Sequence, residues 1–243
     1  MSAAWVNGEW LAFDLETTGI NKQEDVPVSF ALVTLQSGEV VASRYSVVDP
    51  RREIPEGASA VHGISTEQAR AEGMDLDEAV QEIAGVLVDA SKRGVPVVGF
   101  NLSYDLTMID ACCRRLDGRG LVERGWAGPV LDPLVMDKEL VRFRKGAGSR
   151  KLERLIVEFG ITNEAAHDAR GDAVASALLL RKFAEKHPEV GGVELDQLYE
   201  DQAKWNKRWA GEFNDYLMRN GKPGFTNEEF EWPLQIVTEG RLF

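Results

Sequence analysis

The order of the expected elements predicts an α/β fold, with a mixed five-stranded sheet flanked by helices. Three stretches rich in β-branched and apolar residues come first, which is typical of neighbouring antiparallel strands. Two more apolar stretches then alternate with helical patterns, which is typical of parallel strands joined by helices. The five expected strands are residues 10–16, 28–35, 40–48, 95–100 and 130–134.

Helical spacing of apolar residues identifies the helices. The clearest case is residues 75–92, where apolar side chains recur at steps of three and four until Gly94 follows the end. Residues 54–65 lack that spacing and are expected to form a loop. Further helices are expected at residues 104–116, 152–159 and 171–186.

The length of 243 residues fits one domain with an extension. We expect an α/β domain over residues 1–190 and a C-terminal helical extension and tail over residues 191–243. In the extension, Trp205, Trp209 and Phe213 belong to one aromatic stripe along an expected helix. Such a stripe either packs back onto its own domain or binds a partner or stacked bases.

The charge and the apolar content narrow the class of protein. A net charge of −12 argues against a broad duplex-binding surface, although carboxylates that hold metals also add acidity. No apolar stretch approaches the ~20 residues of a membrane span, and no secretory signal is visible, so no membrane partner is expected. The adjacent Cys112 and Cys113 favour reduced thiols and a cytoplasmic location.

Residues 142–151 reverse the overall sign, with five basic side chains around the stretch Gly146-Ala147-Gly148-Ser149. This composition fits a solvated loop or an arm that contacts phosphates. The glycine and lysine spacing of a nucleotide-binding P-loop is lacking, so that site is rejected.

Asp14 and Glu16 are the most informative pair, because they lie two residues apart inside an apolar strand. Alternate residues of a strand point to the same face, so the two carboxylates are expected to lie on one face of the sheet. Burying two like charges is costly unless a cation is bound, and hard divalent ions prefer oxygen ligands. Other acidic pairs, such as Asp137 and Glu139, lie in contexts where water is expected to solvate them.

Three residues farther along the chain can join this pair. Asp105 follows the strand at residues 95–100, where α/β sheets bind ligands, although an acidic residue there also stabilises a helix N-terminus. His167 and Asp172 are five residues apart, about 140° around a helix. If the helix begins near Arg170, His167 lies on the preceding loop and can reach over the site, unless it is only a surface or capping residue.

Three segments resemble the motifs of a known enzyme family. They are Phe13-Asp14-Leu15-Glu16-Thr17-Thr18-Gly19, Asn101-Leu102-Ser103-Tyr104-Asp105 and His167-Asp168-Ala169-Arg170-Gly171-Asp172-Ala173. In order and spacing they are similar to the motifs of DnaQ-like 3′–5′ exonucleases, in the DEDDh subgroup whose last motif carries histidine. The resemblance covers residues 8–184, and Tyr104, where phenylalanine is common, is a departure expected to matter little.

The resemblance implies a ribonuclease H-like fold in which Asp14, Glu16, Asp105 and Asp172 hold two Mg²⁺ or Mn²⁺ ions. Two such ions can activate water and stabilise both the phosphate and the departing oxygen. Asp14 would bridge the ions, Glu16 and Asp172 would complete the tighter site with Glu16 also orienting the water, and Asp105 would hold the second ion partly through water. His167 would be the general base, since a pKa of about 6.5 leaves it largely able to accept a proton.

The same resemblance implies a site for the 3′-terminal nucleotide. Thr17, Thr18 and Gly19 end the first strand and are expected to recognise the terminal 3′ hydroxyl. The segment Val61-His62-Gly63-Ile64-Ser65 resembles the substrate-side loop of the family. His62 is therefore expected to touch this nucleotide or to have a structural role in the loop.

The predicted function is release of 5′-mononucleotides from nucleic-acid 3′ ends, with single-stranded DNA favoured. An RNA 3′-end exonuclease of the oligoribonuclease or RNase T kind is the alternative, because the sequence does not show how a 2′ hydroxyl is treated. Proofreading would act in trans with a polymerase, since these 243 residues contain no polymerase domain. A phosphatase with Asp14 as nucleophile lacks a matching lysine motif, and a non-catalytic nucleic-acid-binding module would not need His167.

Overall fold

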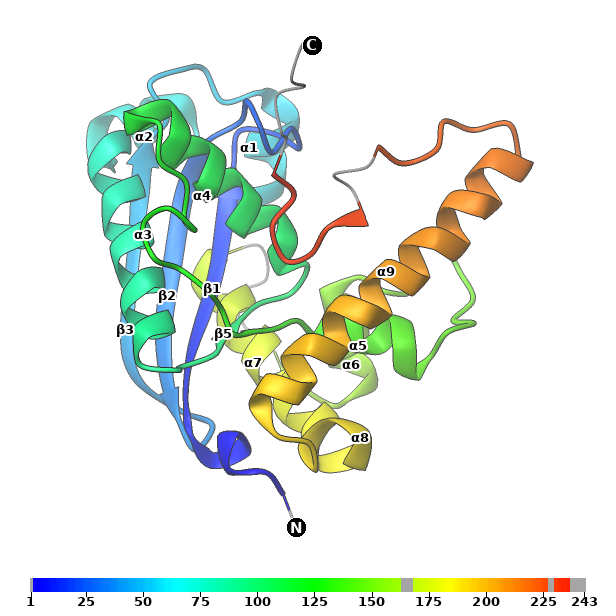
Figure 1. Ribbon diagram of the computed structural model, residues 1–243. Coiled ribbons are helices and arrows are strands. Elements are labelled where there is room, and N and C mark those ends of the chain that lie inside the picture. Colours follow the sequence, from blue (N-terminus) through cyan, green and yellow to red (C-terminus); the bar gives the residue numbers. More distant parts are fainter. Residues whose placement is uncertain (1, 163–167, 227–229, 237–243) are drawn as a thin grey trace.

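A mixed sheet with helices on both faces is the frame of the computed structural model, which describes residues 2–162, 168–226 and 230–236 (Figure 1). Its strands are β1 Glu9–Thr17, β2 Pro27–Gln36, β3 Glu39–Asp49, β4 Met74–Asp75, β5 Val97–Val98 and β6 Val130–Leu131. Its helices are the 3₁₀ turn η1 Ala4–Asn7, α1 Glu56–His62, α2 Thr66–Glu72, α3 Leu76–Lys92, α4 Leu102–Asp117, α5 Pro133–Leu140, α6 Leu152–Glu158, α7 Ala169–Lys186, α8 Pro188–Gly191 and α9 Leu195–Arg219.

The strand order is β4-β3-β2-β1-β5-β6, which places β1 inside the sheet. β1 pairs antiparallel with β2 and parallel with β5, and β2 pairs antiparallel with β3. The mixed directions confirm the predicted fold class. Within the described residues the sheet has six strands and not five, because the two-residue β4 pairs with the end of β3. Two residues are too few to give a periodic signal.

The alternation of side chains along β1 separates the core into two layers. Leu11, Phe13 and Leu15 pack with the apolar faces of α3 and α4. Trp10 and Ala12 pack with the apolar face of α7. Figure 1 shows α3 and α4 in front of the sheet and α7 behind it. Because the even-numbered residues of β1 face α7, Asp14 and Glu16 are directed to that side.

The segment at residues 54–65 is not the continuous loop that its sequence predicts. Its middle forms α1, which follows Pro55 and ends at Gly63, a glycine with a φ of 77°. No residue of α1 is buried, so the helix leaves no apolar period in the sequence. α5 was also not predicted, although Asp132 accepts a hydrogen bond from Leu134 N–H and precedes Pro133, a typical helix start.

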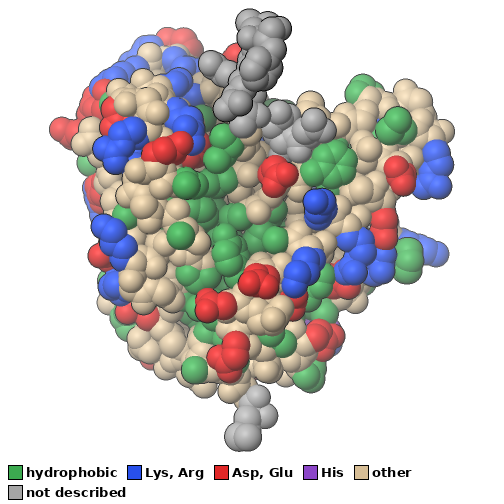
Figure 2. All heavy atoms as spheres, viewed as in Figure 1, with side chains coloured by type: hydrophobic (Ala, Val, Ile, Leu, Met, Phe, Trp, Pro, Cys, Tyr) green, Lys and Arg blue, Asp and Glu red, His purple; other side chains and the backbone are tan. Residues whose placement is uncertain are grey.

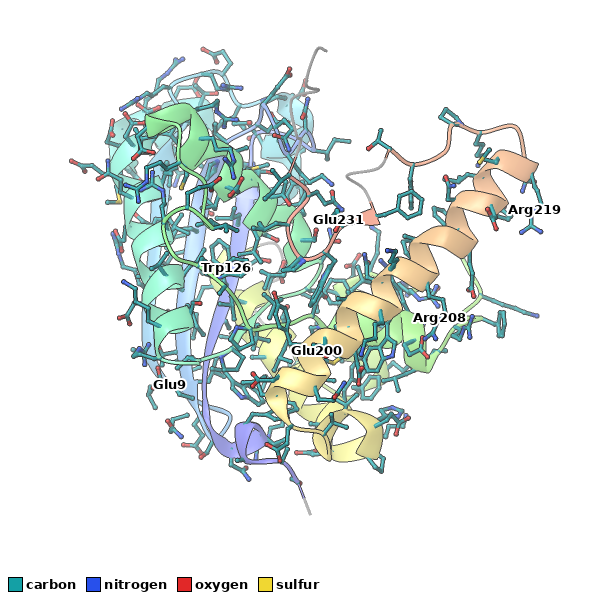
Figure 3. The ribbon with its side chains drawn as sticks, in the orientation of Figure 1. Glu9, Trp126, Glu200, Arg208, Arg219 and Glu231 are labelled. Carbon is teal, nitrogen blue, oxygen red and sulfur yellow. The ribbon has the colours of Figure 1, made fainter. Side chains whose placement is uncertain are left out.

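α9 joins the sheet at its β6 edge. The buried Gln202 side chain donates to the Val130 carbonyl at 2.9 Å and accepts from the Asp132 N–H at 2.8 Å. The aromatic stripe of this helix is divided, because Trp205 packs into the α7 core layer whereas Phe213 is exposed. Figure 3 shows α9 running from Glu200, near the sheet, to Arg219 at its free end. The chain then returns towards α4 (Figure 1).

Apolar side chains gather on the face between α4 and α9 (Figure 2). Trp126, Tyr199 and Trp232 belong to the α3–α4 core layer in this region. In the part of the chain that the structure describes, no helix combines the length and the apolar character that crossing a bilayer requires.

Candidate active site

Three of the four predicted carboxylates meet between β1 and α7. One oxygen from each of Asp14, Glu16 and Asp172 lies within 4.8 Å of the others. β1 supplies the first two from one face, and α7 supplies Asp172 from its first turn. That turn is fixed by Asp168, whose side chain accepts from Arg170 N–H at 2.8 Å and caps the helix.

Asp105 approaches the same strand from α4, on the other side of the sheet. It is buried, and its Oδ1 accepts from the Leu15 backbone N–H at 3.1 Å, between the two acidic residues of β1. Asp105 is not among the carboxylates that meet within 4.8 Å. Its charge nevertheless raises the pKa of Asp14, so it belongs to the same electrostatic centre.

The pKa values of Asp14 and Glu16 are shifted upwards. Burial is the largest cause for Asp14, followed by repulsion from Asp105 and Asp172. Burial and repulsion from Asp172 and Asp168 raise the pKa of Glu16 to about 8. In the described part of the chain, neither Asp14 nor Glu16 makes an ion pair with a cationic side chain. Asp168 therefore has a second effect, which sequence reasoning missed: it adds negative charge to the cluster.

This donor set fits a divalent cation. It offers carboxylate oxygens and no sulfur, which is the ligand type that Mg²⁺, Mn²⁺ and Ca²⁺ prefer. A bound cation would stabilise the ionised carboxylates that burial and mutual repulsion disfavour. The geometry therefore supports a metal centre made by Asp14, Glu16 and Asp172, with Asp105 beside it.

A cavity of about 490 Å³ adjoins the carboxylates at the end of β1. Its walls bring together the residues that the sequence assigns to the substrate side: Glu16, Thr17, Thr18, Gly19 and His62. The remaining walls include exposed apolar side chains, among them Ile20 and, on α1, Val61. The helix that sequence reasoning missed thus supplies one side of the cavity.

The loop after β1 is held by side chains that the sequence did not single out. The Tyr104 hydroxyl lies 2.7 Å from Thr17 Oγ1 and donates to the Gly19 carbonyl. Phenylalanine could make neither contact, so the departure at Tyr104 adds two hydrogen bonds. Thr18 donates to Asp25 at 2.7 Å, and a Cβ at Gly19 would lie 2.6 Å from the Asp25 carboxylate. The position after Thr18 therefore needs glycine.

Of the two histidines predicted to belong to the site, the structure describes only His62. His62 Nδ1 accepts from the Ile64 N–H at 3.1 Å, which places the proton of the neutral ring on Nε2. Burial lowers the pKa of His62, so the ring is neutral near pH 7. The predicted base His167 lies outside the described residues, which resume at Asp168.

The basic segment at residues 142–151 is tied into the fold by ion pairs. Arg144 and Arg150 bind the carboxylate of Asp137 at 2.7 and 3.0 Å, and Arg142 pairs with Glu212. The expectation that water solvates Asp137 was wrong, because its side chain is fully buried between these arginines. These arginines are therefore structural partners, which argues against a free arm that tracks phosphates.

The mixed sheet and the carboxylate cluster on β1 and α7 define an α/β protein with a candidate metal centre, and the comparisons identify its family. The model of the family described as Exonuclease (RNase_T) matches residues 11–180. The chain belongs to this exonuclease family. The predicted resemblance is confirmed.

Two relatives are similar in sequence. The DNA polymerase III PolC-type protein of Thermotoga petrophila is 24% identical over 196 residues, which are 81% of this chain and 13% of that protein. The DNA polymerase III subunit epsilon of Treponema pallidum is 25% identical over 183 residues, or 74% of this chain and 79% of that protein. The chain thus spans only a small part of its PolC-type relatives.

A solved structure confirms the predicted ribonuclease H-like fold. Exonuclease I of E. coli, in complex with a dT13 oligonucleotide, superposes with a TM-score of 0.63 and 21% identity. The superposition covers 74% of this chain and 42% of that one.

Proposed function

We propose that this chain removes nucleotides one at a time from the 3′ end of single-stranded DNA and releases 5′-mononucleotides. The observation that carries the proposal is the carboxylate cluster of Asp14, Glu16 and Asp172, which opens into the cavity at Thr17–Gly19. DNA is favoured because both relatives are named for DNA polymerase III and the exonuclease I structure holds a DNA strand. These names also support a polymerase partner.

In this proposal Asp14, Glu16 and Asp172 would hold Mg²⁺ or Mn²⁺, with Asp105 contributing to a second ion. Two such ions supply an activated water, stabilise negative charge on the phosphate and assist the departing 3′ oxygen. His167 accepts the proton of the attacking water, which is the task of a base that is largely neutral at pH 7.

The chain itself positions the terminal nucleotide. The hydroxyls of Thr17 and Thr18 are already bonded to Tyr104 and Asp25. Gly19 N–H makes no hydrogen bond within the described residues, so it is one donor that remains for the 3′ hydroxyl. Ile20 and Val61 give the cavity apolar surface that can pack against the sugar and base.

Digestion of end-labelled strands tests this function. Single-stranded DNA, duplex DNA and RNA, each labelled at the 3′ or the 5′ end, are incubated with Mg²⁺ or with EDTA. We expect immediate release of 3′ label as a mononucleotide, gradual shortening of 5′-labelled strands and fastest action on single-stranded DNA. Asp14→Asn is the inactive control. Activity that survives chelation, or release of internal fragments alone, would contradict the proposal, and faster action on RNA would overturn its choice of DNA.

A further inference from the structure

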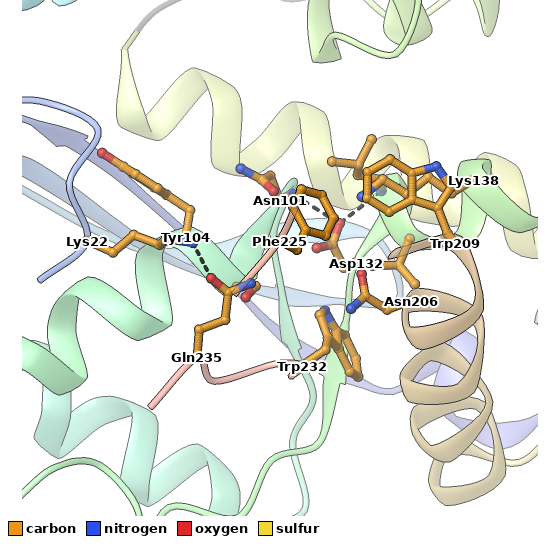
Figure 4. Close-up of a pocket in the computed structure, with 13 residues that line it drawn as sticks. Lys22, Asn101, Tyr104, Asp132, Lys138, Asn206, Trp209, Phe225, Trp232 and Gln235 are labelled. Atoms are coloured by element: carbon orange, nitrogen blue, oxygen red, sulfur yellow. Dashed lines mark hydrogen bonds between the residues drawn. The ribbon is translucent and has the colours of Figure 1, made fainter. Parts of the chain in front are cut away.

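A second cavity, of about 230 Å³, lies where α4, α5 and α9 meet. Figure 4 shows Asn101, Lys138 and Trp209 around it, with Trp232 of the returning segment on the opposite side. Tyr104 connects the two cavities, because it lines the second one while its hydroxyl is bonded to Thr17 and Gly19 of the first. The family model ends at residue 180, so the walls supplied by α9 and the returning segment lie outside it.

The cavity contains the buried ammonium group of Lys138, whose charge interacts with the Asp132 carboxylate. Lys138 Nζ lies 3.6 Å from the centroid of the Trp209 ring, and burial lowers the pKa of Lys138 to about 8. Its ammonium group is therefore still mainly charged near pH 7. No ion pair joins Lys138 to a carboxylate in the described residues. Asp132 also lines the cavity, but its oxygens accept from the backbone N–H groups of Asn101, Leu102 and Leu134.

Two further buried groups in the walls have hydrogen-bonding capacity left. Ser103 is 9% exposed, and its Oγ has no hydrogen-bond partner among the described residues. The same is true of the buried Trp232 Nε1, which can only donate. Both line the same cavity as Lys138. An ammonium, a hydroxyl and an indole N–H between aromatic walls match a ligand that carries acceptor oxygens and a flat ring, which is the chemistry of a nucleotide.

Stacked aromatic rings continue from this cavity along α9. The Trp209 ring stacks on Phe213 with centroids 5.1 Å apart and planes 14° apart. The Phe213 ring stacks in turn on that of Tyr216, with centroids 5.9 Å apart and planes inclined by 18°. The exposed fraction rises along the row, to 36% at Phe213 and 50% at Tyr216. Rows of accessible aromatic rings beside a cationic groove are the usual platform for unpaired bases.

We propose that the cavity and the row Trp209, Phe213 and Tyr216, here called the α9 track, bind the single strand on the 5′ side of its terminal nucleotide. One nucleotide occupies the cavity with its phosphate on Lys138, and the next bases stack along Phe213 and Tyr216. This inference rests on the proposed function, because it assumes that the 3′ end lies in the first cavity.

Binding of oligothymidylates of increasing length tests the track. Affinity is measured by fluorescence anisotropy in an Asp14→Asn background, so that the strands stay intact. Lys138→Met is expected to weaken binding about tenfold. It should also reduce the slope of log affinity against log salt concentration by about 0.7, the value for one phosphate contact on a single strand. Its thermal unfolding is recorded beside it, since this lysine is buried.

The exposed end of the track offers a substitution that leaves the hydrophobic core unchanged, so the variant is expected to fold. Tyr216→Ala is expected to weaken binding at least about fivefold, and only for strands long enough to reach α9. Tyr216→Phe keeps the stacking ring and should retain the affinity. Lys204→Ala removes an exposed charge of α9 that is paired with Asp201 outside the track, and it should bind as the parent does.

A mononucleotide substrate separates the two proposals. The p-nitrophenyl ester of thymidine 5′-monophosphate reaches the first cavity but not the track, so its hydrolysis by the wild-type chain tests the proposed function alone. If the ester and the labelled strands are cleaved while Lys138→Met and Tyr216→Ala bind every length as the parent does, the track is overturned and the function stands. If neither substrate is cleaved, the proposed function fails and the track fails with it.

Discussion

Two acidic centres of this chain are compensated in opposite ways. At Asp137, two arginines of the following segment bind the carboxylate, at 2.7 and 3.0 Å. At Asp14 and Glu16, no cationic side chain of the described residues forms an ion pair, and the nearest charged groups are further carboxylates. Both centres contain an acidic residue with a second one two positions away, so the sequence pattern alone does not distinguish them.

The difference between the two centres indicates whether the cation that balances the carboxylates comes from the chain itself or from solution. A buried charge is tolerated when it is paired or bound to a metal. The Asp137 centre contains its own cations, the two arginines, so we expect it to contribute to folding stability and not to metal binding. The centre at β1 depends on a cation from outside the chain, and binding that cation is part of its function.

The largest effect is expected at Asp14. Asp14→Asn should lower turnover on single-stranded DNA by at least about 10³-fold, because the metal centre loses its central ligand. In EDTA the same variant should be at least as stable as the wild type, since one repelled charge is gone. Initial rates and urea unfolding measure the two halves. A clear loss of stability in EDTA would show that the carboxylate is compensated within the chain.

Asp137→Asn is the matched control at the other centre. Removing one partner of a buried ion pair costs about 3–5 kcal/mol, so we expect a fall of about 3 kcal/mol or more in the free energy of unfolding. Turnover per folded molecule should not change, as judged by rates normalised to the folded fraction. Full stability with lost turnover would reverse the roles of the two centres.

The third effect separates charge compensation from proton transfer at the β1 centre. His167→Ala should lower turnover by at least about 10²-fold, the usual contribution of a general base, while metal affinity survives. Calorimetric metal titration beside single-turnover rates measures both quantities. Lost metal affinity would assign His167 to the metal centre and not to the water.

The smallest effect is the response of the metal-free protein to pH. Folding raises the pKa of Glu16 from 4.5 to about 8, so the folded state binds more protons in that window. The free energy of unfolding in EDTA should therefore fall as pH rises from about 4.5 to about 8, and Glu16→Gln should flatten this slope. Urea unfolding at several pH values provides the curve. An unchanged slope in Glu16→Gln would mean that other groups, such as Asp14, cause the pH dependence.

The strands and the acidic pair of β1 were predictable because their signals are local. Alternation along residues 10–16 places Asp14 and Glu16 on one face, and the structure keeps them there. α1 was missed because none of its residues is buried, so no apolar period marks it. β4 was missed because it has only two residues.

The compensation of each charge was not predictable, because it depends on contacts between distant segments. Arg144 reaches Asp137 through the fold of its loop, and Asp105 reaches Leu15 across 90 positions of the chain. The role of the Tyr104 hydroxyl likewise becomes clear only from its contact with Thr17 in the structure. Sequence patterns show which residues are acidic or aromatic, whereas only the structure shows what each one faces.

Calorimetric titration with Mn²⁺ tests most directly whether the β1 centre takes its cation from outside the chain. Wild type and Asp137→Asn, measured where both are folded, should bind Mn²⁺ and gain thermal stability from it. Asp14→Asn should lose most of that affinity and that gain. Equal Mn²⁺ binding by wild type and Asp14→Asn, or no binding by the wild type, would contradict the account.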